Sequence, residues 1–168
     1  MNEVRMTTLP NKTPALTAKH PFLIDMAPRH IAIVLQGATE QQFKPDEIIF
    51  REGEPANRFY LINWGEVALE AKCPGDGMVH IQTLRGGDVL GWSWLFAPFA
   101  WNFQARALKD TRVIACDGGH LLVASEDDDK FGHELVKRLA YVTIRRLQET
   151  RKQLVQLQSS VSGKSGAA

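Results

Sequence analysis

The chain has 168 residues, which is enough for one domain with a packed core and an extended arm but small for two full domains. Hydrophobic residues at 44% and charged residues at 23% are ordinary for a folded globular protein, so the composition excludes wholesale disorder and a fibrous structure. Twenty Lys and Arg against nineteen Asp and Glu leave a net charge of +1, so a polyanionic partner would have to bind a local patch.

The N-terminal stretch MNEVRMTTLPNKTPALTAKH shows no steady hydrophobic period, and we expect residues 1–20 to form a flexible arm. The acidic Glu3 and the lack of an apolar stretch argue against a secretory signal, so we expect a cytoplasmic location. From Pro21 onward one helical face is apolar, with an interruption at Pro28, which predicts a short broken helix. The apolar positions of this face are Phe22, Leu23, Met26, Ile31, Val34 and Leu35.

Residues 42–117 alternate short apolar runs with glycine and charge, a pattern typical of a small β-barrel or sandwich. The PGDG sequence at 74–77 predicts the clearest hairpin turn, because Asp-Gly suits the positive φ values of a tight turn. Gly53, Gly65 and Gly87 each precede a carboxylate between two strand-like runs, and we interpret them as turn glycines with no ligand role.

After Ser125 the hydrophobic period lengthens, and the proline-free sequence predicts one long helix over residues 127–158, capped by Ser125 or Asp127. An apolar stripe in its first half consists of Phe131, Leu135, Leu139 and Val142. A second stripe has heptad spacing and predicts a homodimer seam; it consists of Val136, Ala140, Thr143, Leu147, Thr150, Leu154 and Leu157. The alternative is that this half of the helix packs back on its own domain. Residues 159–168 are expected to be a flexible tail.

Two motifs indicate a family. The first is IIFREGEPANRFYLINWGEVAL at 48–69, and the second is LRGGDVLGWSWL at 84–95. Together with the order of elements over about residues 20–158, they resemble the cyclic-nucleotide-binding domain of bacterial catabolite-activator regulators and kinase regulatory subunits. The resemblance implies a mainly β fold with flanking helices. The expected architecture is a double-stranded β-helix (jelly-roll) barrel over residues 21–126 with a long C-terminal dimerisation helix.

In that family, the phosphate-binding cassette carries a glutamate after the glycine and an arginine about nine residues later. This chain has Trp92 after Gly91 and Trp101 in the arginine position, followed by Asn102. The indoles could stack on a planar ligand or fill the pocket so that nothing enters. Arg106 lies an odd number of residues beyond Trp101 in a strand-like segment, so we expect it on the opposite face as a supporting residue. The predicted ligand-binding residues are Gly91, Trp92, Ser93, Trp94, Leu95, Trp101 and Asn102.

Other function classes have less support. The five histidines are isolated in the sequence, and Cys73 and Cys116 lack metal-site spacing, so we predict neither a metal site nor a catalytic centre. The apolar segment 89–105 contains Gly91 and Pro98 and is shorter than the roughly 20 apolar residues of a membrane span, so no membrane partner is expected. The basic stretch RRLQETRK at 145–152 is interpreted as a solvated flank of the helix, and we do not expect this chain alone to bind DNA.

The sequence therefore predicts a non-catalytic sensor or regulatory module that signals through its C-terminal helix. No cofactor is certain; its effector would be a cyclic nucleotide or another planar small molecule, and its downstream protein partner is not indicated. The alternatives are a ligand-free dimerisation or docking domain, or the ligand-sensing fragment of a larger transcription regulator.

Overall fold

The computed structural model describes residues 6–8, 19–75 and 77–165, and its centre is a pair of antiparallel β-sheets. One sheet has five strands in the order β1-β2-β9-β4-β7, with bounds Met6–Thr8, Thr39–Phe43, Thr111–Asp117, Arg58–Trp64 and Val89–Leu90. The other has four strands in the order β3-β8-β5-β6, with bounds Ile48–Phe50, Gln104–Ala107, Glu66–Cys73 and Gly77–Arg85. The predicted mainly β jelly roll with flanking helices is confirmed, but the two sheets do not close into a barrel.

The core lies between the two sheets and continues on the other face of the first sheet, where helical segments pack against it. Between the sheets, Tyr60 of β4 stacks on Phe50 of β3 with ring centroids 5.9 Å apart. Val67 and Ala105 of the second sheet are fully buried. Residues 59–62 of β4 are therefore buried without a break, since Phe59 on the other face contacts Phe22 and Trp94.

The turns agree with the interpretation of the glycines. β5 and β6 form a hairpin in which Cys73 pairs with Gly77, as the PGDG sequence predicts. Gly65 joins β4 to β5 with a φ of +108°, and a Cβ atom there would lie 2.4 Å from the Thr111 hydroxyl oxygen. Because no side chain fits at that distance, only glycine allows β5 to begin beside β9.

Three residues of the predicted N-terminal arm, Met6–Thr8, form strand β1. β1 pairs with the edge of β2, with Met6 opposite Gln41. An exposed strand edge has unpaired N–H and C=O groups, so an extended segment can pair with it without a strong hydrophobic pattern of its own. The remainder of the predicted arm, apart from residues 19 and 20, lies outside the described residues.

The predicted broken helix is present as two pieces, a 3-10 helix Pro21–Leu23 and α1 Pro28–Leu35. Pro28 occupies the first helical position of α1, where its missing N–H costs nothing, so it begins the second helix instead of kinking a single one.

The predicted long C-terminal helix is present as α3 Asp129–Ser165, which begins two residues later than expected and extends past residue 158. A separate helix, α2 Gly118–Asp127, precedes it. Asp128 separates them because its carboxylate accepts hydrogen bonds from the backbone N–H groups of Lys130 and Phe131. This is N-cap chemistry one residue beyond the predicted caps. The helix continues to Ser165 through much of the predicted tail 159–168, because extending an existing helix costs far less than starting one.

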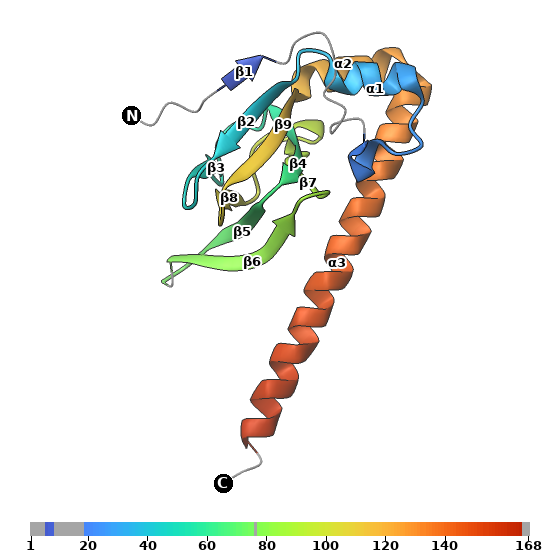
Figure 1. Ribbon diagram of the computed structural model, residues 1–168. Helices are drawn as coiled ribbons and strands as arrows, with labels where there is room; N and C mark the ends of the chain where they lie inside the picture. The colour runs from blue at the N-terminus through green and yellow to red at the C-terminus, as the bar shows by residue number, and fades with distance from the viewer. Residues whose placement is uncertain (1–5, 9–18, 76, 166–168) are drawn as a thin grey trace.

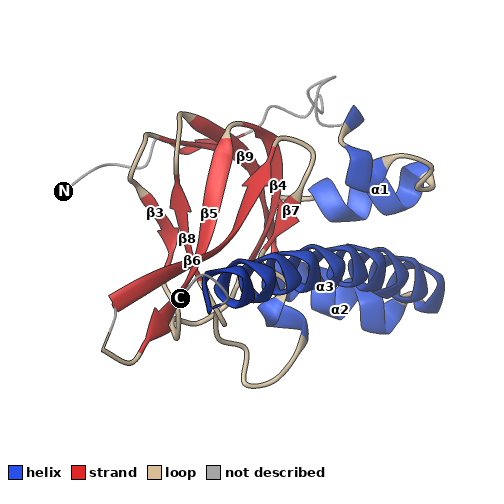
Figure 2. Ribbon diagram, turned by 90° about the horizontal axis from the view of Figure 1, so that it is seen from below, coloured by secondary structure: helices blue, strands red, loops and turns tan. Residues whose placement is uncertain are grey.

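The first turns of α3 lie beside α1 and α2, whereas its second half extends well past the sheets (Figure 1, Figure 2). Phe131, Leu135 and Leu139 are buried and Val142 packs against the core, so the first predicted stripe is the face that attaches α3 to the domain. Beyond this stripe α3 is mostly exposed.

Candidate functional site

The predicted cassette begins at the end of β7 and runs through a 3-10 helix, Ser93–Leu95, to a loop before β8. Gly91 has a φ of +82°, and a Cβ atom there would lie 3.0 Å from the Arg58 carbonyl oxygen and 3.0 Å from the Trp101 ring. The glycine is therefore required for the chain to pass closely beside the indole.

Trp101, in the arginine position of the family pattern, is part of the core. It is 5% exposed, and its ring stacks on Phe50 with centroids 4.0 Å apart and planes inclined by 16°. Tyr60 is the next aromatic ring, at 6.5 Å, and burial raises the pKa of its hydroxyl to about 12. The indole thus packs among aromatic groups of the core.

Trp94 is also buried, at 3% exposure, beneath the start of α2. A Cβ atom on Gly118 would lie 2.6 Å from the Trp94 ring, so this glycine makes room for the indole. The indole nitrogen Nε1 is buried without a hydrogen-bond partner among the described residues. Trp94 therefore fills the space between the cassette and α2.

The remaining cassette residues are closer to the surface. The Asn102 side chain donates to the Ser93 hydroxyl oxygen at 3.4 Å, and Leu95 is partly buried against the core. Trp92, in the glutamate position, is partly exposed and lies against α3. The structure thus divides the seven predicted residues into buried indoles with their glycine and a more exposed group around Trp92.

Arg106 has the supporting role expected from its spacing. Its guanidinium donates to the Glu70 carboxylate and, at 2.7 Å, to Asp46. The neighbouring Ala105 and Ala107 are fully buried toward the core, so Arg106 lies on the outer face of the sheet. Its hydrogen bonds hold the pKa of Glu70 below its ordinary value. Arg106 is therefore committed to an ion pair away from the cassette.

Arg146, which the sequence pattern did not single out, links α3 to the cassette. Its guanidinium donates to the carbonyl oxygen of Val89 in β7 and lies 4.4 Å from the centre of the Trp92 ring, the geometry of a cation–π contact. Burial lowers the pKa of Arg146 to about 10. The interpretation of 145–152 as a solvated flank is therefore wrong at this residue. The core stripe of α3 gave an available signal, since four residues beyond Val142 its spacing reaches position 146.

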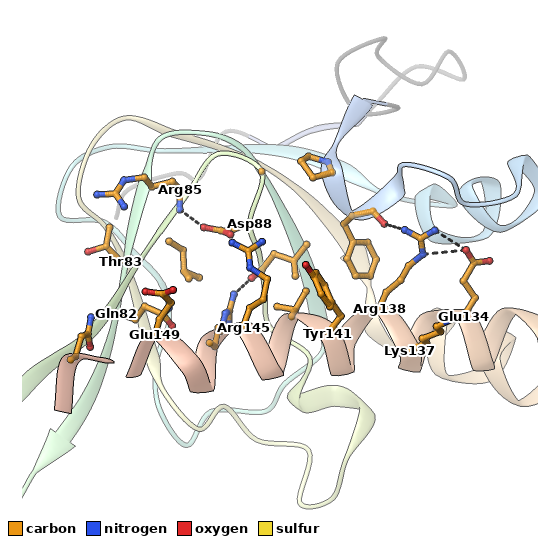
Figure 3. A pocket seen from close by; sticks show the side chains of 18 of the residues that line it. Gln82, Thr83, Arg85, Asp88, Glu134, Lys137, Arg138, Tyr141, Arg145 and Glu149 are labelled. Carbon is orange, nitrogen blue, oxygen red and sulfur yellow. Dashed lines mark hydrogen bonds and ion pairs between the residues drawn. The ribbon is translucent and has the colours of Figure 1, made fainter. Parts of the chain in front are cut away.

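A cleft of about 930 Å³ lies between β6, the turn into β7 and α3 (Figure 3). None of the seven predicted ligand-binding residues lines it. Its helix wall includes Tyr141 and Arg145, and its strand wall includes Gln82 and Arg85. The cleft joins segments far apart in the sequence, so no local motif marks it.

All seven residues of the predicted dimer seam are exposed in the single chain. Leu147, Leu154 and Leu157 are 68%, 56% and 65% exposed, so this stripe does not pack back on its own domain. Large apolar side chains in a row on one helix face are unusual on a surface that stays in water. The stripe is thus available for a partner.

No group of three His, Cys, Asp or Glu side chains that could hold a metal ion occurs in the described part of the chain. Across residues 6–8, 19–75 and 77–165, no helix is long and apolar enough to cross a membrane. Cys73 and Cys116 are free thiols, and burial raises the pKa of Cys116 to about 12.

Known proteins resemble this chain in both sequence and fold. It is 28% identical over 131 residues to the CRP-like cAMP-activated global transcriptional regulator of Mycobacterium tuberculosis, a match that covers 77% of this chain and 56% of the regulator. The chain thus spans little more than half the length of that relative.

Among solved structures, a cyclic nucleotide-binding protein from Geobacter metallireducens has a TM-score of 0.73 and 24% identity, over 81% of this chain and 98% of that one. The sensor domain of the transcriptional regulator DNR from Pseudomonas aeruginosa has a TM-score of 0.64 and 17% identity, over 80% of this chain and 90% of that one. At these identities the two structures support the fold alone.

The family model for the cyclic nucleotide-binding domain matches residues 40–128. This segment contains every strand from β4 to β9 and the whole cassette, and it covers more than half of the chain. The chain therefore belongs to the cyclic nucleotide-binding domain family.

Proposed function

We propose that this chain is a non-catalytic sensor and regulatory domain that passes the state of its cassette to its C-terminal helix. The observation that carries the proposal is the position of Arg146, which donates a hydrogen bond to the Val89 carbonyl oxygen just before the cassette and lies over Trp92 within it. Because Arg146 belongs to α3, a displacement of the cassette would change the contacts of the helix.

The energetics favour a two-state response at this contact. A guanidinium in a partly buried site loses hydration, and only hydrogen bonds and nearby rings or charges compensate it. If β7 or Trp92 moves, Arg146 must find other partners or return to solvent. An effector shifts such an equilibrium only by its difference in affinity for the two arrangements.

The proposed effector site is the divergent cassette, with indoles in both positions where the family pattern has charged anchors. A cyclic nucleotide there would lack the usual arginine, so its phosphate would be held by weaker donors. The proposal includes a homodimer through the exposed seam and a cytoplasmic role with a separate protein as target. Control of transcription is a property of the M. tuberculosis relative, and our proposal for this chain stops at the sensor domain.

A ligand-free regulatory or docking domain is the second candidate, and the packing of Trp101 favours it. An indole that is 5% exposed and stacked on Phe50 occupies interior space instead of lining an empty site. In this case, the cassette would hold α3 in one position permanently, and dimerisation or docking would be the whole function.

Calorimetric titration distinguishes the two candidates. Cyclic AMP, cyclic GMP and cyclic di-GMP would each be added while tryptophan fluorescence is recorded, since Trp92 would respond to a change at Arg146. Heat together with a spectral change for one of them supports the sensor. If none produces either signal, the effector part of the proposal is wrong and the ligand-free candidate replaces it.

The link to α3 has its own test, which needs no ligand. Arg146→Gln should accelerate amide hydrogen exchange both in residues 89–95 and in the middle of α3, because the bond that joins them is weakened. Arg151→Gln is a matched control on an exposed face of the same helix. If Arg146→Gln accelerates exchange in neither segment, the two parts are not coupled through this residue.

A further inference from the structure

The cleft between β6 and α3 has more basic than acidic side chains, and several of the basic ones are unpaired within the described part of the chain. Its three acidic side chains already have partners: Asp88 accepts from the Arg85 backbone N–H, Glu134 accepts from Arg138, and Glu149 pairs with Lys152. Arg138 is also occupied by the carbonyl oxygens of residues 22 and 24. Glu134 and Glu149 are therefore paired with cations, and Asp88 is the one acidic side chain among the described residues of the cleft that forms no ion pair.

Three cations of the cleft lack an acidic partner. Lys137 and Arg145 make no hydrogen bond or ion pair with any other described residue. Arg146 is partly buried and donates a hydrogen bond only to the Val89 carbonyl oxygen among the described residues. The Asp88 carboxylate attracts its charge without a direct bond. A partly buried guanidinium with unused donors is stabilised by an anion that supplies oxygen atoms to them.

An aromatic ring lies between two of these cations on α3. Lys137, Tyr141 and Arg145 are spaced four residues apart, so they form one ridge of the helix along the cleft (Figure 3). Tyr141 is 64% exposed, and its ring makes no aromatic contact with another described residue. The ridge therefore presents an open aromatic face between two cations.

We propose that this cleft binds a phosphorylated ligand with a planar ring, of nucleotide size. Lys137, Arg145 and the free donors of Arg146 hold the phosphates, and Tyr141 stacks on the ring. A volume of about 930 Å³ suits such a ligand, since small-molecule sites in proteins measure roughly 300–1,000 Å³. The site lies outside the cassette, so it does not depend on the function proposed for the buried indoles.

Titration of ADP, pyrophosphate and adenosine, each followed by calorimetry at low salt, tests the proposal. ADP should bind, pyrophosphate should bind more weakly because it lacks the ring, and adenosine should give no heat. The double variant Lys137→Gln/Arg145→Gln should weaken ADP at least about tenfold, since it removes two charge-assisted contacts. Both side chains are exposed and unpaired, so the thermal midpoint of this variant should remain unchanged.

The matched control is Lys130→Gln/Arg151→Gln, which removes the same charge from exposed positions of α3 that do not line the cleft. It should leave ADP affinity unchanged. Equal weakening by both double variants would show general attraction to a basic helix and overturn the site. Absence of ADP binding up to about 1 mM would overturn it as well. Equal affinity for ADP and pyrophosphate, or no loss in Tyr141→Ala, would overturn the stacking role of Tyr141.

The same double variant separates this site from the cassette. Cyclic AMP that binds in the cleft should lose affinity when Lys137 and Arg145 are replaced, whereas binding beneath Gly91 should be unaffected. The effect of this variant on cyclic AMP affinity therefore shows which of the two proposed sites is occupied, so the two proposals can fail separately.

Discussion

Replacement of Trp101 tests whether the cassette is filled. A tryptophan side chain buries about 150–250 Å², which at about 25 cal/mol/Å² is worth about 4–6 kcal/mol. At 5% exposure nearly all of this contribution is lost in Trp101→Ala. Removal of large aromatic residues from cores costs about 3–5 kcal/mol in measured series. We expect the free energy of unfolding to fall by about 3–5 kcal/mol.

Urea unfolding measures this loss, with the slope of the transition checked for constancy between variants. Trp64→Ala is the matched control, because Trp64 is 59% exposed and its loss should change stability by about 0.5 kcal/mol or less. Trp101→Phe keeps an aromatic ring beside Phe50 and should lose less than the alanine variant, which gives a measurable protein even if Trp101→Ala does not fold. A loss below about 1 kcal/mol in Trp101→Ala would show that the indole is not packed in the core, and stacking of Trp101 on a ligand would then be favoured.

Three other predictions follow from single features. Leu147→Asp combined with Leu154→Asp places two charges in the seam and should give monomers in sedimentation, whereas an unchanged mass would refute the dimer. Burial raises the pKa of Cys116 to about 12, so this thiol should not react with Ellman's reagent at pH 8 until the protein unfolds, and prompt labelling in the native state would contradict its position. Hydrogen bonding from Arg106 lowers the pKa of Glu70, so the carboxylate stabilises the fold above its ordinary value of 4.5, and this stability is lost as the pH falls through the lower folded value. The Glu70→Gln variant should therefore show a weaker fall of thermal midpoint with acid than the parent chain, and parallel curves would contradict the pair.

Much of the sandwich could be predicted from the sequence, because its signals are local. Turn glycines such as Gly65 need a positive φ, and the PGDG turn sets a hairpin between two strand-like runs. The first stripe of α3 follows from the same kind of evidence, since a period of three and four residues defines one helix face. The family motifs combine these local requirements at fixed spacings.

The errors arose where short polar segments decide the structure. The side chain of Asp128 can cap a helix, but Ser125 and Asp127 have the same ability, and only the packing of α2 on the core selects among them. β1 has only three residues, and its place depends on the open edge of β2. Neither result follows from hydrophobic period.

The candidate site was harder to predict than the fold for a related reason. The sequence shows that the family's charged anchors are absent, but it leaves open whether Trp101 lines a pocket or fills it. The contacts of Trp101 with Phe50 and Gly91 come from different strands and turns, so only the folded structure reveals them. Arg146 was misinterpreted because its neighbours in the sequence are basic and polar, although its helix face is the buried one.

Helix geometry makes the proposed cleft and the proposed dimer seam compatible with each other. Successive residues of an α-helix are separated by about 100°, so Arg145 in the cleft and Leu147 in the seam point about 200° apart. A second chain on the seam would therefore leave the cleft open, and an anion in the cleft would not displace the second chain. Arg146 lies between these two faces and contacts the cassette. An effector in the cleft would consequently act by changing the position of Arg146 and the packing of α3 on β7. It would not compete with the dimer partner.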